Sequence, residues 1–206
     1  MKQRNKIIIA SSIIALIILA GIVVVGIWGF NKELKFALSQ KINIYVEQQV
    51  DTDKIKTIAN EVLGMHNMVQ TIEIYKDMVT IRARSISEEQ RNTIVNKVKE
   101  IYEFEQTADK VNIDIVPATR IRDIYKQYVL PLIISGVLVA VYMGIRYHKK
   151  GILKVVLTTI FIPVIAELVL LSWMAIVRIP IGRFTPILSI LVYIASIWLV
   201  VNKNEK

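Results

Sequence analysis

The sequence predicts an α+β membrane protein with four transmembrane helices and one external domain. Its 206 residues are 54% hydrophobic, and the mean hydropathy of +0.49 is too high for a soluble domain. Four apolar runs each approach the ~20 residues that a helix needs to cross the hydrocarbon core. A polar segment, residues 31–128, separates the first run from the other three and is long enough to form a small domain.

The first apolar run, residues 7–30, has no charged side chain and follows Lys2, Arg4 and Lys6. It is longer than the apolar core of a signal peptide, and it continues to Trp28, whose ring suits a membrane interface. We therefore predict an uncleaved anchor. The other runs are residues 129–147, 155–177 and 184–201.

The positions of the charges predict the orientation. The chain has a net charge of +9, yet residues 31–128 contain fifteen Lys and Arg and fifteen Asp and Glu. The excess lies in the membrane flanks, mainly in the N-terminus and in the connector 146–154. By the positive-inside rule both flanks are cytoplasmic. We therefore predict three parts: a cytoplasmic flank and anchor (1–30), a domain on the outer face (31–128), and a three-helix transmembrane bundle with a cytoplasmic tail (129–206).

Alternation and helical spacing predict the first half of the external domain. Apolar residues alternate with polar ones over residues 34–46, which predicts a strand. Apolar residues then recur at helical spacing, after a cap at Asp51 or Thr52 and up to Gly64. The order at this point is β-α.

Further patterns predict the second half. Residues 71–75 and 79–82 alternate around Lys76-Asp77 and predict a hairpin, and residues 111–116 predict a last strand. Between them, Ser87 with Gln90 three residues later forms a capping box that begins a second helix. The complete order, β-α-β-β-α-β, is the ferredoxin-like pattern, and a domain of this size can bury a modest core.

Composition excludes several classes of protein. The chain has no cysteine, so disulfides, thiol nucleophiles and thiolate metal sites are excluded. His66 and His148 lack partners at ligand spacing, and we predict no metal and no cofactor. The sequence has no phosphate-binding loop or hydrolase motif, which argues against an enzyme. The external domain has no basic excess, which argues against nucleic acid.

Glu167 is the candidate functional residue, because it lies near the middle of the third apolar run. A carboxylate there costs several kcal/mol unless it is protonated, paired or hydrated. Pro163 can kink the same helix, and Ser189, Tyr193 and Ser196 share one face of the fourth run. Two interpretations stay open: a proton relay or switch formed by Glu167, Tyr193 and Ser196, or a protonated glutamate that hydrogen-bonds neighbouring helices.

Small residues in the second run predict close helix packing. Gly136, Ala140 and Gly144 are four residues apart, which brings them to one face of a helix. Packing within the protein is favoured, and a partner interface is the alternative. The basic connector 146–154 is expected to contact anionic lipid head groups.

The layout and four local stretches resemble SecF, the smaller half of the SecD/SecF protein-export auxiliary. Family members have a Gly-Pro-x-x-Gly stretch before the second span, a Tyr-Ile-x-x-Arg-Phe-like exit from that span, an apolar run into His-Asp in the third, and a Gly-Tyr-Ser-x-x-Asp-Thr core in the fourth. This chain keeps the proline of the first motif and the tyrosine of the last, and it has Glu in place of Asp in the third. The corresponding stretches here are Val116-Pro117-Ala118-Thr119-Arg120, Tyr142-Met143-Gly144-Ile145-Arg146-Tyr147, Val164-Ile165-Ala166-Glu167-Leu168 and Val192-Tyr193-Ile194-Ala195-Ser196-Ile197-Trp198-Leu199-Val200.

The resemblance implies a component of a bacterial inner membrane that assists protein export. It would pack with a SecD-like subunit or another membrane protein, and its external domain would contact translocating polypeptides. Ile197 stands where the family has an aspartate, residues 35–39 replace an Asp-Phe-Thr-Gly-Gly-like element, and the family has two further spans. A divergent, shortened member with weakened or absent proton coupling is therefore expected. The alternative is a membrane-anchored structural or partner-binding module without transport activity.

Overall fold

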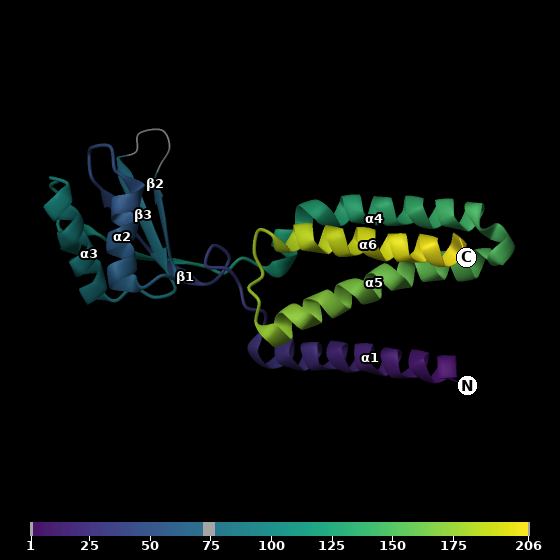
Figure 1. Cartoon of the computed structure of the whole chain (residues 1–206). Helices are drawn as coiled ribbons and strands as arrows, with labels where there is room; N and C mark the ends of the chain where they lie inside the picture. The colour runs from purple at the N-terminus through teal and green to yellow at the C-terminus, as the bar shows by residue number, and fades with distance from the viewer. Residues whose placement is uncertain (1, 72–76, 206) are drawn as a thin grey trace. The chain divides into compact units, whose positions relative to one another are not determined.

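The computed structural model describes residues 2–71 and 77–205 and divides into two compact units (Figure 1). The α/β unit comprises Glu33–Arg120. The helical unit combines the described residues up to Lys32 with those from Ile121 onward. The protein is thus an α+β protein whose α/β unit is inserted, in sequence, after the first helix of the helical unit.

The α/β unit contains the predicted order of elements, β-α-β-β-α-β. Its strands form one sheet in the order β2-β3-β1-β4, and each strand is antiparallel to its neighbours. A short 3₁₀ turn, Ala108–Lys110, precedes the last strand. The elements are β1 (Ser39–Tyr45), α2 (Thr52–Leu63), β2 (Asn67–Thr71), β3 (Met78–Ala83), α3 (Glu88–Ile101) and β4 (Ile113–Val116).

Both helices of this unit begin at the predicted caps. The Asp51 side chain accepts a hydrogen bond from the backbone of Asp53 at 3.0 Å, and α2 ends at Gly64, whose φ is +77°. Ser87 and Gln90 form the reciprocal capping box at the start of α3. Such caps pair backbone N–H groups that the first helical turn leaves without partners.

The bounds of the strands differ from those that the alternation predicted. Strand β1 begins at Ser39 rather than at 34, because the preceding residues turn and bond locally: the backbone N–H groups of Phe36 and Ala37 both donate to the Glu33 carbonyl. Strand β2 begins at Asn67, ahead of the predicted hairpin, whose residues 72–76 lie outside the described part of the chain. Strand β4 begins at Ile113, after the 3₁₀ turn.

A single apolar core fills the space between the sheet and its two helices. Helices α2 and α3 pack against each other and lie on the same side of the sheet (Figure 1). The side chains fully excluded from solvent come from both layers and include Ile42, Ile44, Ile81, Ile55 and Ile94. They are the residues that alternate along β1 and β3 and recur at helical spacing along α2 and α3.

The helical unit contains four helices that are long and apolar enough to cross a membrane. They are α1 (Lys2–Trp28), α4 (Ile121–Arg146), α5 (Ile152–Val177) and α6 (Thr185–Glu205). Helix α5 is central, because it contacts each of the other three, with α1 on one side and α4 and α6 on the other (Figure 1). Helix α4 begins at Ile121 rather than at 129, because its first two turns are formed by the more polar residues that precede the apolar run.

Candidate functional site

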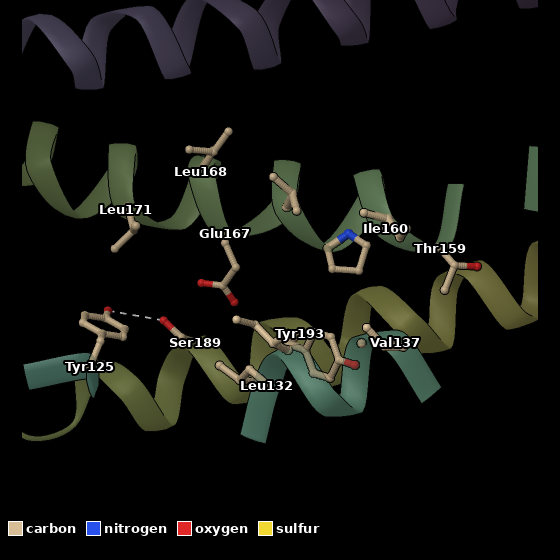
Figure 2. Close-up of a pocket in the computed structure, with 14 residues that line it drawn as sticks. Tyr125, Leu132, Val137, Thr159, Ile160, Glu167, Leu168, Leu171, Ser189 and Tyr193 are labelled. Atoms are coloured by element: carbon tan, nitrogen blue, oxygen red, sulfur yellow. Dashed lines mark hydrogen bonds between the residues drawn. The ribbon is translucent and has the colours of Figure 1, made fainter. Parts of the chain in front are cut away.

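A cavity of about 530 Å³ lies among α4, α5 and α6 of the helical unit (Figure 2). Its walls are mainly apolar. The polar side chains that line it come from all three helices: Tyr125 from α4, Thr159 and Glu167 from α5, and Ser189 and Tyr193 from α6.

Glu167 is the one carboxyl among the described residues that line this cavity. Its partly buried side chain extends from α5 toward α6, on the side of the cavity where Ser189 lies (Figure 2). On the other side of Ser189, the Tyr125 hydroxyl lies 3.4 Å from the Ser189 Oγ. Three helices therefore contribute one group each to a short polar row in an apolar cavity.

Tyr193 and Ser196 have different environments. Tyr193 lines the cavity, and its hydroxyl is 3.1 Å from the Oγ of Ser135, which links α6 to α4. Ser196 is buried but is not a lining residue, and its hydroxyl donates to the Tyr193 carbonyl at 2.6 Å. The cavity therefore brings together Glu167 and Tyr193, whereas the Ser196 hydroxyl bonds to its own helix.

The small residues of α4 face other helices of the same unit. A Cβ atom added to Gly144 would lie 3.0 Å from the Cγ2 of Val156 on α5. One added to Gly136 would lie 4.0 Å from the Tyr193 hydroxyl on α6, and Ala140 is only 5% exposed. All three positions thus contribute to packing inside the helical unit.

Sequence reasoning missed Tyr125. The second span was predicted to begin at 129, which left this tyrosine outside the membrane segment. The sequence did contain a signal for Tyr125. Tyr125, Leu132 and Gly136 stand at i, i+7 and i+11, which places them on one face of a helix that extends N-terminally beyond the apolar run. All three line the cavity.

The cavity can hold a proton or a cation, but it offers few ligands for a metal ion. Nowhere in residues 2–71 and 77–205 do three His, Cys, Asp or Glu side chains gather as a metal site would require. None of the described lining residues is basic. Glu167 therefore has hydroxyl neighbours in the cavity and no cation.

A second contact holds α1 against α5. A Cβ atom added to Gly21 would lie 2.6 Å from the Cα of Ser172, so the two backbones approach closely at this point. At the end of α1, the Arg178 guanidinium donates to the Gly29 carbonyl and the Asn31 amide donates to the Arg178 carbonyl, both at 2.8 Å. These bonds attach the end of α1 to the loop between α5 and α6.

The chain matches no model of a known protein family and no curated protein. Its site is therefore interpreted from the residues and the geometry described above.

Proposed function

We propose that this protein is a SecF-like component of a bacterial inner membrane that assists protein export. The observation that carries the proposal is the order of its parts. One membrane-capable helix precedes a β-α-β-β-α-β unit, and three more such helices follow, one of which carries Glu167 in a cavity. This is the order that the resemblance to SecF implies.

We assign the α/β unit to the ferredoxin-like class. Strands β1 and β2 are both antiparallel to β3, which lies between them, so they run parallel to each other. Helix α2 connects them, which makes the first part of the unit a split β-α-β arrangement. In the proposed function this unit contacts translocating polypeptides or a partner on the outer face of the membrane.

Contacts at one end of the helical unit support cytoplasmic N- and C-termini. The Arg146 guanidinium lies 3.6 Å from the Glu205 carboxylate, and the Lys150 ammonium donates to the Asn204 carbonyl at 2.6 Å. The basic connector and the end of α6 therefore share one end of this unit, and the start of α1 lies there too (Figure 1). A basic end of this kind is typical of the cytoplasmic side.

Helix α1 offers a surface for a SecD-like subunit or another membrane protein. Of the four membrane-capable helices it buries the smallest share of its apolar window, 6%, within the described structure. Several of its apolar side chains, including Leu16 and Leu19, are more than half exposed. In a membrane such a surface faces lipid or packs with another helix.

Proton coupling is proposed to be weak or absent. In the related proteins it depends on intramembrane carboxylates, and Ile197 replaces one of them. Glu167 then has two candidate roles, a switch that exchanges a proton or a hydrogen-bonding group that holds α5 to α6. The measured effect of Glu167→Gln on export separates these roles.

The test is export of a secreted reporter in a strain that lacks this chain. We expect the precursor to accumulate, the wild-type chain to restore export, and a SecD-like subunit to co-purify in mild detergent. Glu205→Gln is the matched control, because it removes a carboxylate at the end of α6. If Glu167→Gln restores export fully, the proton-exchange role is excluded.

A normal export rate without the chain would contradict the proposal itself. Purification only as a self-associated complex, together with normal export, would favour the alternative, a membrane-anchored structural or partner-binding module. Orientation is tested separately by labelling single cysteines introduced into this cysteine-free chain. Asp109→Cys should react from outside intact cells, and Lys149→Cys only after permeabilisation.

A further inference from the structure

We propose that the cavity among α4, α5 and α6 binds an amphiphile that has a positively charged amine head and an apolar chain. The volume of about 530 Å³ lies within the roughly 300–1,000 Å³ that small-molecule sites occupy. Such sites combine apolar walls with a few convergent polar groups, and this cavity has the same composition.

The charge of the lining selects a cationic head. Glu167 is partly buried, and no Lys, Arg or His is found among the described residues that line the cavity. A carboxylate in apolar surroundings is stabilised by a cation that also donates hydrogen bonds. A protonated amine meets both needs, because it carries the charge and has donors for Glu167 and for the adjacent Ser189.

The available hydroxyls locate the head within the cavity. Thr159 donates to the Val155 carbonyl at 2.8 Å, and the Tyr193 hydroxyl is paired with Ser135. The Ser189 and Tyr125 hydroxyls, 3.4 Å apart, are the ones on the same side of the cavity as Glu167, so the head is placed at this Glu167–Ser189–Tyr125 row. These three groups lie together on one side of the cavity (Figure 2).

The remaining wall suits an apolar chain that arrives from the membrane. Leu132, Ile160, Leu168 and Leu171 also line the cavity, and of these Leu132 and Leu171 lie nearest the polar row in Figure 2. Leu168 is also 44% exposed, so the wall extends to the outer surface of the helical unit. A chain dissolved in lipid can therefore enter along this wall while its head binds Glu167.

The experiment uses the purified full-length chain in lipid nanodiscs and a long-chain alkylamine with a photoreactive diazirine in its chain. Labelled peptides are mapped by mass spectrometry, and unlabelled dodecylamine or dodecanol is added as competitor. We expect labels on cavity residues and competition by the amine at concentrations at least about tenfold lower than by the alcohol, since hydrogen bonds to charged groups contribute about that factor or more.

Two variants separate charge from shape. Glu167→Gln keeps the side-chain volume and should abolish the preference for the amine, whereas Glu205→Gln, the control at the end of α6, should retain it. Leu132→Trp fills the apolar part of the cavity and should reduce labelling by either probe. Because no export step is involved, these results are independent of the proposed export function.

The proposal would be overturned by an absence of label in the cavity, by equal competition from amine and alcohol in the wild-type chain, or by an unchanged amine preference in Glu167→Gln. Protection of the cavity by a co-purified membrane protein, with no amine bound, would also overturn it, because the occupant would then be a partner helix. A cavity-specific label that is lost in Glu167→Gln supports it.

Discussion

The two units of this protein differ in the side chains that they bury and expose. In the α/β unit, large apolar residues such as Ile42, Ile44 and Ile81 are fully excluded from solvent. In the helical unit, large apolar residues such as Leu138 and Trp198 are more than 60% exposed. This unit also buries apolar residues such as Met143 and Ile181. Five of its buried residues are serines or threonines, namely Thr159, Ser172, Thr185, Ser189 and Ser196, whereas Ser39 is the one buried serine or threonine among the described residues of the α/β unit.

The difference follows from the solvent of each unit. In water, burial of apolar surface is the main driving force for folding, so large aliphatic side chains form the core. In hydrocarbon there is no such force between helices, and close packing of small residues with interhelical hydrogen bonds holds them together. The contacts of Gly21 with Ser172 and of Ser135 with Tyr193 are of this second kind.

The largest expected effect is in the apolar core of the α/β unit. Ile44→Ala should lower the free energy of unfolding of a soluble fragment, residues 33–120, by about 2–5 kcal/mol, because it leaves a cavity at a fully buried site. Urea denaturation followed by circular dichroism measures this. Ile115→Ala is the control, since Ile115 is 71% exposed and its loss should change stability by less than about 0.5 kcal/mol. Equal losses in the two variants would contradict the assigned core.

The next effect tests packing by small residues in the helical unit. Gly21→Ala should separate α1 from α5, because the new methyl group would overlap the Ser172 backbone, and overpacking costs about 1–3 kcal/mol. Disulfide formation between cysteines introduced at Ile18 and Leu168, which line the same groove, measures the contact. Gly26→Ala should leave the yield unchanged, since nothing lies within 4 Å of its added Cβ. An undiminished yield in Gly21→Ala would contradict the close approach.

A smaller effect concerns the cap of α3. Ser87→Ala removes the hydroxyl that accepts the Gln90 N–H at 3.1 Å, and it should lower the stability of the α/β unit by about 0.5–2 kcal/mol. The urea midpoint of the same soluble fragment is the measurement. Ser85→Ala, at an exposed position before the helix, is the control. A wild-type midpoint for Ser87→Ala would show that the capping box contributes nothing.

The smallest effect is a pH dependence at the surface of the α/β unit. A hydrogen bond to Asp77 and the charge of that carboxylate raise the pKa of Tyr45 above its usual value of 10.0. Since the folded pKa is the higher one, the stabilisation is present below the usual pKa and is lost as pH rises through the raised pKa. In an NMR titration, Asp77→Asn should lower the Tyr45 midpoint, whereas Asp109→Asn should not. An unchanged Tyr45 titration midpoint in Asp77→Asn would exclude the interaction between Tyr45 and Asp77.

The strongest sequence predictions rested on local physics. The cap at Asp51, the capping box at Ser87 and the helix end at Gly64 are short-range backbone effects, and the structure has all three. The apolar runs were recognised because span length is set by the thickness of the hydrocarbon core. Boundaries such as the start of α4 at Ile121 were less accurate, since a helix can continue beyond its apolar run.

The candidate site was predictable only in part. Glu167 was evident from the sequence, because placing an acid within a membrane-spanning helix costs free energy whichever helices pack around it. Ser189 and Tyr193 were predicted as possible neighbours, since they share one face of the fourth run, and both line the cavity. Tyr125 was not predicted, because it lies on another helix and spacing along one helix does not tell which faces will meet. Ser196 shows the limit: it lies at helical spacing from Ser189, yet its hydroxyl bonds to the Tyr193 carbonyl of its own helix.

By itself the sequence determined the four membrane-capable helices, the β-α-β-β-α-β order and the position of the one acid within the apolar runs, because length, periodicity and charge act along the chain. The tertiary structure decided that α5 contacts every other helix of its unit and that Tyr125, Glu167 and Ser189 share one cavity. These arrangements depend on how side-chain shapes and hydroxyl groups match between helices far apart in sequence. That matching is a property of the packed helices, and no single segment contains it.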